Sequence, residues 1–113
     1  MNTLKISQQT ELILPKMGIM TSLLELSRHD YIYVKDSLNR NQILSIEKDE
    51  TRFWNEQALA IYHKGFKLGY LNTSISKIVA KLINRFGAVK VSIQNMPQNT
   101  NPFSGMDILI QIS

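Results

Sequence analysis

The sequence predicts a small, mainly β domain of the α+β class, folded as a partly open β-barrel with one or two helices. Short apolar runs separated by turn residues recur along most of the chain, which is typical of strands. Only one segment has a clear helical period, and 113 residues correspond to a single domain. A chain of this length buries roughly 65% of its unfolded surface, so its core needs no disulfide or metal.

The expected strands follow one another closely along the chain. Residues 1–22 form an N-terminal segment, either a strand or extended, in which TELIL is strand-like and Pro15 and Gly18 end any longer element. The domain proper covers residues 23–113. Its strands are expected within 21–34, as one or two, and at 43–48, 58–62, 66–71, 88–93 and 107–113. The HKG turn joins two of them as a hairpin, because Gly65 can take a positive φ.

The clearest element is a helix in NTSISKIVAKLINRFG, residues 72–87. Its apolar residues share one face, which we expect to be core: Ile75, Ile78, Val79, Leu82, Ile83 and Phe86. Thr73 or Ser74 is expected to cap its start, and Gly87 its end. The opposite face carries a cationic line about 12 Å long, at about 1.5 Å per residue, formed by Lys77, Lys81 and Arg85.

Composition narrows the class of function. The absence of cysteine excludes disulfides and thiolate metal sites and fits a reducing compartment. No stretch reaches the ~20 apolar residues of a membrane span, and the N-terminus does not resemble a secretion signal, so we expect a cytoplasmic protein without a membrane partner. Thirteen Lys and Arg against nine Asp and Glu give a net charge of +4, which favours anionic partners, nucleic acid first.

Catalysis has little support in the sequence. Neither His29 nor His63 has a second histidine at metal-ligand spacing, and His63 is expected to be exposed at the hairpin turn. No serine has the flanking glycines of a nucleophile elbow, and no phosphate loop occurs. The acidic cluster is expected to be a solvated loop edge rather than a magnesium nuclease site: Glu47, Asp49, Glu50 and Glu56. We therefore expect no enzyme activity, no metal and no cofactor.

Aromatic residues accompany the helix cations. The single tryptophan, Trp54, lies in a polar loop, residues 49–57, and not in an apolar pattern. Considered without the aromatic residues, the lysines of the helix are more simply explained as its solvent-exposed face than as a contact for nucleic acid. Single-stranded nucleic acid, however, is held by cations along its phosphates and by rings stacked on its bases, for about 1–3 kcal/mol per base. Further aromatic residues stand in neighbouring segments, namely Tyr31, Tyr33, Phe53 and Tyr70; Phe53 is equally suited to the core, and one of the first two is expected to be buried.

Residues 43–83 resemble the HIRAN domain. Lys48-Asp49 stands where that family has Arg-Glu at the end of a strand, Trp54 is the loop aromatic, and ALAIY replaces Ala-Ile-x-Val. The Gly69-Tyr70-Leu71 step matches the family's Gly-Tyr-Ile element, and a helix follows. The resemblance covers about residues 23–93 and fits the final strand as well. It implies an OB-like, non-catalytic barrel, similar to modules that recognise the 3′ end of single-stranded DNA, some of which are stand-alone bacterial proteins.

The chain departs from the family pattern at several positions. In the loop, Thr51 or Arg52 replaces the family's asparagine, and Asn55 replaces the aspartate that can accept a hydrogen bond from a terminal hydroxyl. After Leu71, Asn72 and Thr73 replace a proline and a basic residue. In the first strand, Arg28 and His29 replace a pair of tyrosines.

Two hypotheses follow. In the first, the chain is a non-catalytic module for single-stranded DNA or DNA 3′ ends, in which Trp54 and Tyr70 stack on bases, Asn55 bonds a terminal sugar or base edge, and cations neutralise phosphates. The residues predicted to form this interface are Arg28, His29, Tyr31, Arg52, Trp54, Asn55, Tyr70, Thr73, Lys77 and Lys81. In the second, the same barrel has lost DNA binding and serves protein interaction or assembly, as a homo-oligomer or with a protein partner.

Overall fold

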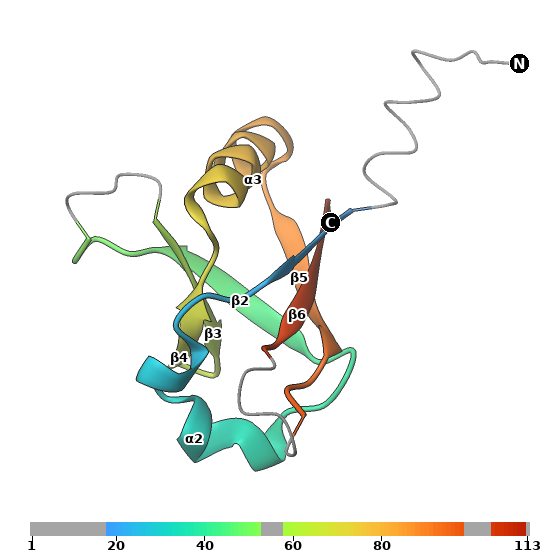
Figure 1. The fold of residues 1–113 in the computed structure, drawn as a ribbon. Helices are drawn as coiled ribbons and strands as arrows, with labels where there is room; N and C mark the ends of the chain where they lie inside the picture. Colours follow the sequence, from blue (N-terminus) through green and yellow to red (C-terminus); the bar gives the residue numbers. More distant parts are fainter. Residues whose placement is uncertain (1–17, 53–57, 99–104, 113) are drawn as a thin grey trace, which may run out of the picture.

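The computed structural model describes residues 18–52, 58–98 and 105–112. In these ranges six strands form one antiparallel sheet in the order β1-β6-β5-β2-β3-β4. The strands are β1 Ile19–Ser22, β2 Ile43–Lys48, β3 Leu59–His63, β4 Phe66–Tyr70, β5 Val89–Asn95 and β6 Asp107–Ile112. The sheet curls into a half-barrel with a helix over one end (Figure 1), which confirms the predicted mainly β, OB-like fold class.

The two edges of the sheet are joined by a single bridge. Leu24 follows β1 and pairs with Tyr70 at the end of β4: the Leu24 amide donates to the Tyr70 carbonyl at 2.8 Å, and the Tyr70 amide donates back at 3.0 Å. Gly69 permits this approach, because a Cβ at that position would lie 2.4 Å from the Leu24 carbonyl oxygen. One bridge in place of a full ladder leaves the barrel partly open.

The core fills the inside of the curl. Strand residues supply most of its fully buried side chains, among them Ile61, Leu68, Ile93, Ile108 and Ile110. In β6 the buried and less buried positions alternate, as expected for a strand with one face toward the core.

The helix α3, Thr73–Phe86, agrees with its predicted range but differs in two details. Its N-cap is Asn72, whose side-chain oxygen accepts from the Ile75 amide at 2.9 Å, so the prediction of Thr73 or Ser74 was wrong by one residue. The predicted apolar face is also only partly core. Ile78 and Phe86 are exposed, because the helix contacts the barrel through the flank that carries Val79.

Residues 26–37 form short helical turns, whereas one or two strands were expected within residues 21–34. They form η1 Leu26–Arg28, α2 Tyr31–Val34 and η2 Lys35–Ser37. Asp30 anchors this segment to β4, since its amide donates to the Lys67 carbonyl and its carboxylate accepts from the Lys67 amide. Tertiary contacts of this kind override the β-propensity of apolar and aromatic residues.

The predicted β3–β4 hairpin is confirmed. Lys64 and Gly65 form its turn with positive φ angles of 49° and 88°. The exposure predicted for His63 was wrong, because the turn takes only those two residues and leaves His63 as the last, buried residue of β3.

Candidate functional site

A buried carboxylate organises a polar network where β2 and β4 end. Asp49 directly follows β2 and is almost fully buried. It accepts hydrogen bonds from the Tyr70 hydroxyl, from Lys67 Nζ at 3.0 Å, and from the amide and hydroxyl of Thr51, the amide at 2.9 Å. Lys67 Nζ also donates to the Tyr70 hydroxyl oxygen at 2.9 Å. Asp49 is therefore no part of a solvated loop edge, because β4 supplies two hydrogen-bond donors that hold it in the buried position, Lys67 and Tyr70.

The electrostatics of this network favour an ion pair at neutral pH. The hydrogen bonds from Thr51, followed by that from Tyr70, hold the pKa of Asp49 well below its usual range, although burial opposes them. Burial also acts to lower the pKa of Lys67, but its hydrogen bonds with Tyr70 and Asp49 outweigh this and raise it. Both shifts stabilise the charged forms.

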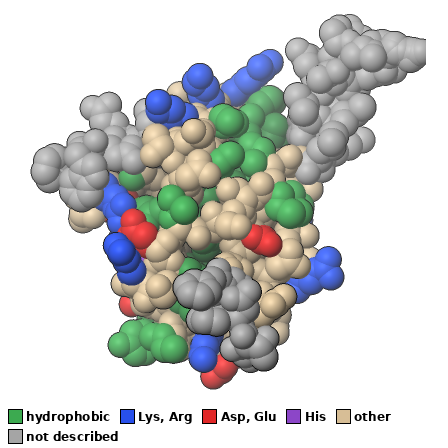
Figure 2. Space-filling model, in the orientation of Figure 1, with side chains coloured by type: hydrophobic (Ala, Val, Ile, Leu, Met, Phe, Trp, Pro, Cys, Tyr) green, Lys and Arg blue, Asp and Glu red, His purple; other side chains and the backbone are tan. Residues whose placement is uncertain are grey.

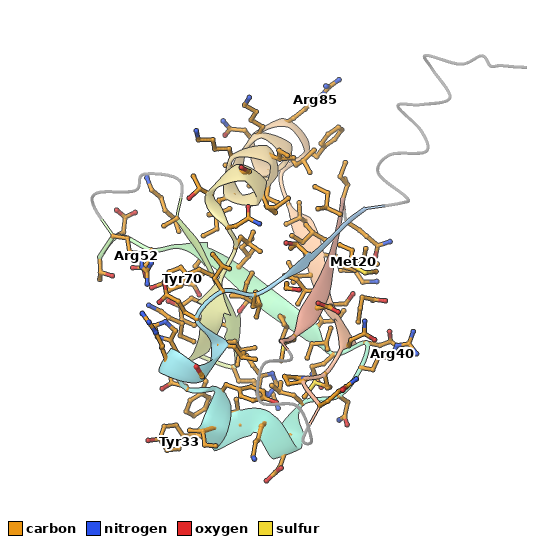
Figure 3. The ribbon with its side chains drawn as sticks, viewed as in Figure 1. Met20, Tyr33, Arg40, Arg52, Tyr70 and Arg85 are labelled. Carbon is orange, nitrogen blue, oxygen red and sulfur yellow. The ribbon has the colours of Figure 1, made fainter. Side chains whose placement is uncertain are left out.

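Arg52 covers the ring of Tyr70. Its guanidinium carbon lies 3.6 Å from the ring centroid, a cation–π contact. Figure 3 labels the two side chains near each other. The Arg52 Nη2 group donates to Glu25 Oε1 at 2.7 Å, which raises the pKa of Arg52 and lowers that of Glu25. His29 Nε2 lies 3.2 Å from the same carboxylate oxygen, and its ring stands edge-on to Tyr70 with centroids 5.4 Å apart. These contacts fix the start of the polar loop against the barrel.

Three predicted interface residues thus come together, namely His29, Arg52 and Tyr70. The stacking role predicted for Tyr70 was wrong, because its side chain is only 4% exposed and Arg52 occupies its face. Trp54 and Asn55 lie outside the described residues.

The remaining predicted residues lie around this network. Tyr31 is half-buried against the core, and burial raises the pKa of its hydroxyl. Thr73 is exposed at the start of α3, just after Tyr70 and the cap. Three cations are exposed and take part in none of the ion pairs found between described residues: Arg28, Lys77 and Lys81. Figure 2 shows Lys and Arg side chains along α3 and a second group on the flank of the molecule.

Glu25, Asp49 and Lys67 complete the network and were not predicted. Lys67 carried a usable signal, since it is the one charged residue in the otherwise apolar hairpin strand FKLGYL. A lone lysine in such a strand points to a buried anionic partner. The sequence did not identify that partner.

Two kinds of feature are absent from the described ranges. No three His, Asp or Glu side chains there converge in the manner of a metal site. None of the helices in the same ranges combines the length and apolarity needed to cross a bilayer.

Comparison with curated proteins and with solved structures gave no match. Comparison with protein families matched residues 22–113, most of the chain, to the HIRAN domain. The match includes the end of β2, the polar loop, the Gly69–Tyr70 step that meets Leu24, and α3. The chain therefore belongs to the HIRAN domain family, a family of nucleic-acid-binding modules.

Proposed function

We propose that this chain is a non-catalytic module that binds single-stranded DNA, including DNA 3′ ends, through the polar loop 49–57 and the cations around its base. Family membership over residues 22–113 is the observation that carries the proposal. The distribution of charge supports it, because exposed basic side chains stand on both η1 and α3, namely Arg28, Lys77 and Lys81.

The phosphates are bound by exposed cations. Arg28, Lys77 and Lys81 have no ion-pair partner among the described residues, so their ammonium and guanidinium groups need not break a salt bridge to bind DNA. Arg52 is held by Glu25 and serves mainly to shape the base of the loop. With about three phosphate contacts on a single strand, the logarithm of affinity falls with the logarithm of salt concentration with a slope of about −2.

The base-stacking role falls to Trp54. Tyr70 is covered by Arg52, which makes it a positioning residue that ties the loop base to Asp49 and β4. In this proposal Trp54 stacks on a terminal base, and the Asn55 amide bonds the terminal sugar hydroxyl or a base edge. Stacking of about 1–3 kcal/mol corresponds to about 5- to 150-fold in affinity.

The test measures the fluorescence anisotropy of a labelled single-stranded oligonucleotide. Replacing both Lys77 and Lys81 by alanine should weaken binding at low salt and make the salt slope shallower by about 1.4, since each contact contributes about 0.7. The matched control is Lys35→Ala, which removes one exposed charge from η2. If the affinity falls equally for each charge removed from α3 and from η2, net charge and not the α3 surface determines binding.

A second comparison addresses the strand end. Oligonucleotides with a 3′ hydroxyl and with a 3′ phosphate are titrated against the unaltered protein and the Asn55→Ala variant. The proposal expects tighter binding of the 3′ hydroxyl, and a smaller preference in the variant. Equal affinity for the two oligonucleotides would show that the protein binds single strands without recognising the 3′ end.

A further inference from the structure

One side of α3 is an uncovered apolar row. Ile78, Leu82 and Phe86 recur every four residues and so align along the helix over about 12 Å. Ile78 is 47% and Phe86 45% exposed, while Leu82 is half-buried. Figure 2 shows hydrophobic side chains beside the Lys and Arg side chains of α3, on the side where β1 begins.

This row is not used by the proposed DNA site. In the proposed site the phosphates contact Lys77 and Lys81, which lie with Arg85 on the neighbouring cationic line of α3. Large aliphatic and aromatic side chains that are half-exposed in a contiguous row mark a surface that another apolar group covers. We therefore expect a segment with apolar side chains to cover this row, called the α3 apolar row below.

The sheet register brings the N-terminal part of the chain to this place. β1 runs antiparallel to β6 with Ile19 opposite Ile110, and β6 pairs with β5 so that Ile112 is opposite Val89. The Gly18 end of β1 therefore lies level with the beginning of β5, about 10 Å away across one intervening strand. Val89 follows α3 closely, since only Gly87 and Ala88 separate it from Phe86.

Gly18 stands directly before β1 and close to β6. It has a φ of 73°, and a Cβ there would lie 2.6 Å from the Ile110 carbonyl oxygen, so this position requires glycine. Leu12, Ile13 and Leu14 stand four to six residues before it. At about 3.3 Å per residue they can lie up to roughly 13–20 Å from Gly18, which exceeds the distance of about 10 Å to the beginning of β5, the strand that follows Phe86 and the end of the row.

We propose that Leu12-Ile13-Leu14, which precede the described part of the chain, dock on the α3 apolar row. The composition of this segment matches the row: three large aliphatic side chains, with Glu11 directly before them. α3 itself has basic but no acidic residues, so Glu11 is complementary to the cations that border the row. The proposal is independent of DNA binding.

Disulfide trapping in the full-length chain tests this docking, and the absence of native cysteine makes each product unambiguous. The test pair is Leu14→Cys with Phe86→Cys. The control pair is Leu14→Cys with Tyr33→Cys, because Tyr33 is 78% exposed and Figure 3 places it at the opposite end of the molecule from Arg85, the neighbour of Phe86. Circular dichroism establishes that both reduced proteins keep the fold.

Under mild oxidation the proposal expects an intramolecular disulfide in the test pair, forming at least about tenfold faster than in the control pair. In the reduced Leu14→Cys variant, the thiol should also react more slowly with iodoacetamide than the thiol of a Tyr33→Cys variant. Equal rates of disulfide formation in the two pairs would overturn the proposal. So would a disulfide that forms mainly between two copies of the chain, because the row would then be covered by a second molecule.

Discussion

The Asp49 network makes a prediction whose size follows from its contacts. Asp49→Ala removes the acceptor for Thr51, Lys67 and Tyr70 at once. Breaking a buried ion pair by removing one partner costs about 3–5 kcal/mol. The Lys67 side chain retains 22% exposure and can regain some water, so we expect the lower end of that range, about 3 kcal/mol of the free energy of unfolding.

Urea unfolding followed by circular dichroism at pH 7 measures this loss. With a denaturant slope of about 1.5 kcal/mol per molar urea, the midpoint should fall by about 2 M. The control is Glu47→Ala, which removes an exposed carboxylate on β2 and should change stability by less than about 0.5 kcal/mol. A loss of under about 1 kcal/mol for Asp49→Ala would refute the claim that this carboxylate fixes the loop base.

The same network sets a pH dependence. The folded-state pKa of Asp49 lies below its ordinary value of 3.8, so its contribution is present above that value and is lost as the pH falls through the lowered one. Lys67 has a raised pKa, so its contribution is present below its ordinary value of 10.5 and is lost only as the pH rises through the raised one. The stability difference between the native chain and Asp49→Ala should stay constant from about pH 5 to about pH 9 and shrink below about pH 4. A difference that shrinks between pH 5 and pH 9 would contradict this assignment.

Two further predictions concern the frame that holds the site. Gly69→Ala places a Cβ against the Leu24 carbonyl and should destabilise the protein by about 1–3 kcal/mol in urea unfolding, whereas Gly105→Ala, with open space around it, should be near neutral. Equal effects at the two glycines would contradict the bridge. Asn72→Ala removes the α3 cap and should cost about 1 kcal/mol, more than Thr73→Ala, and a larger loss at Thr73 would reverse the cap assignment.

The elements that the sequence predicted well, α3 and the β3–β4 hairpin, are each determined by residues close together in the chain. The spacing of apolar residues gave α3, and the Lys64-Gly65 turn gave the hairpin, since both patterns are set within a few residues. The N-cap differed by one residue because Asn, Thr and Ser are all good caps and stand next to one another.

The features that were missed depend on contacts between distant residues. The helical turns after β1 form where Asp30 bonds to Lys67, 37 positions away along the chain, and no local pattern reports that pairing. The burial of Tyr70 likewise requires Asp49 and Arg52 from the end of β2. The contacts among Arg52, His29 and Tyr70 join three separate segments of the chain, and the sequence could not show that Arg52 covers the tyrosine.

Fluorescence titration of the native protein reports directly on DNA binding at the polar loop, because Trp54 is its only tryptophan. Single-stranded and 3′-tailed oligonucleotides are added at low salt, and the titration is repeated at increasing salt. If DNA binds through this loop, the fluorescence of Trp54 is quenched with saturation, and the logarithm of affinity falls with the logarithm of salt concentration at a slope of about −2. Unchanged emission at low salt with every single-stranded and 3′-tailed oligonucleotide would contradict DNA binding through this loop.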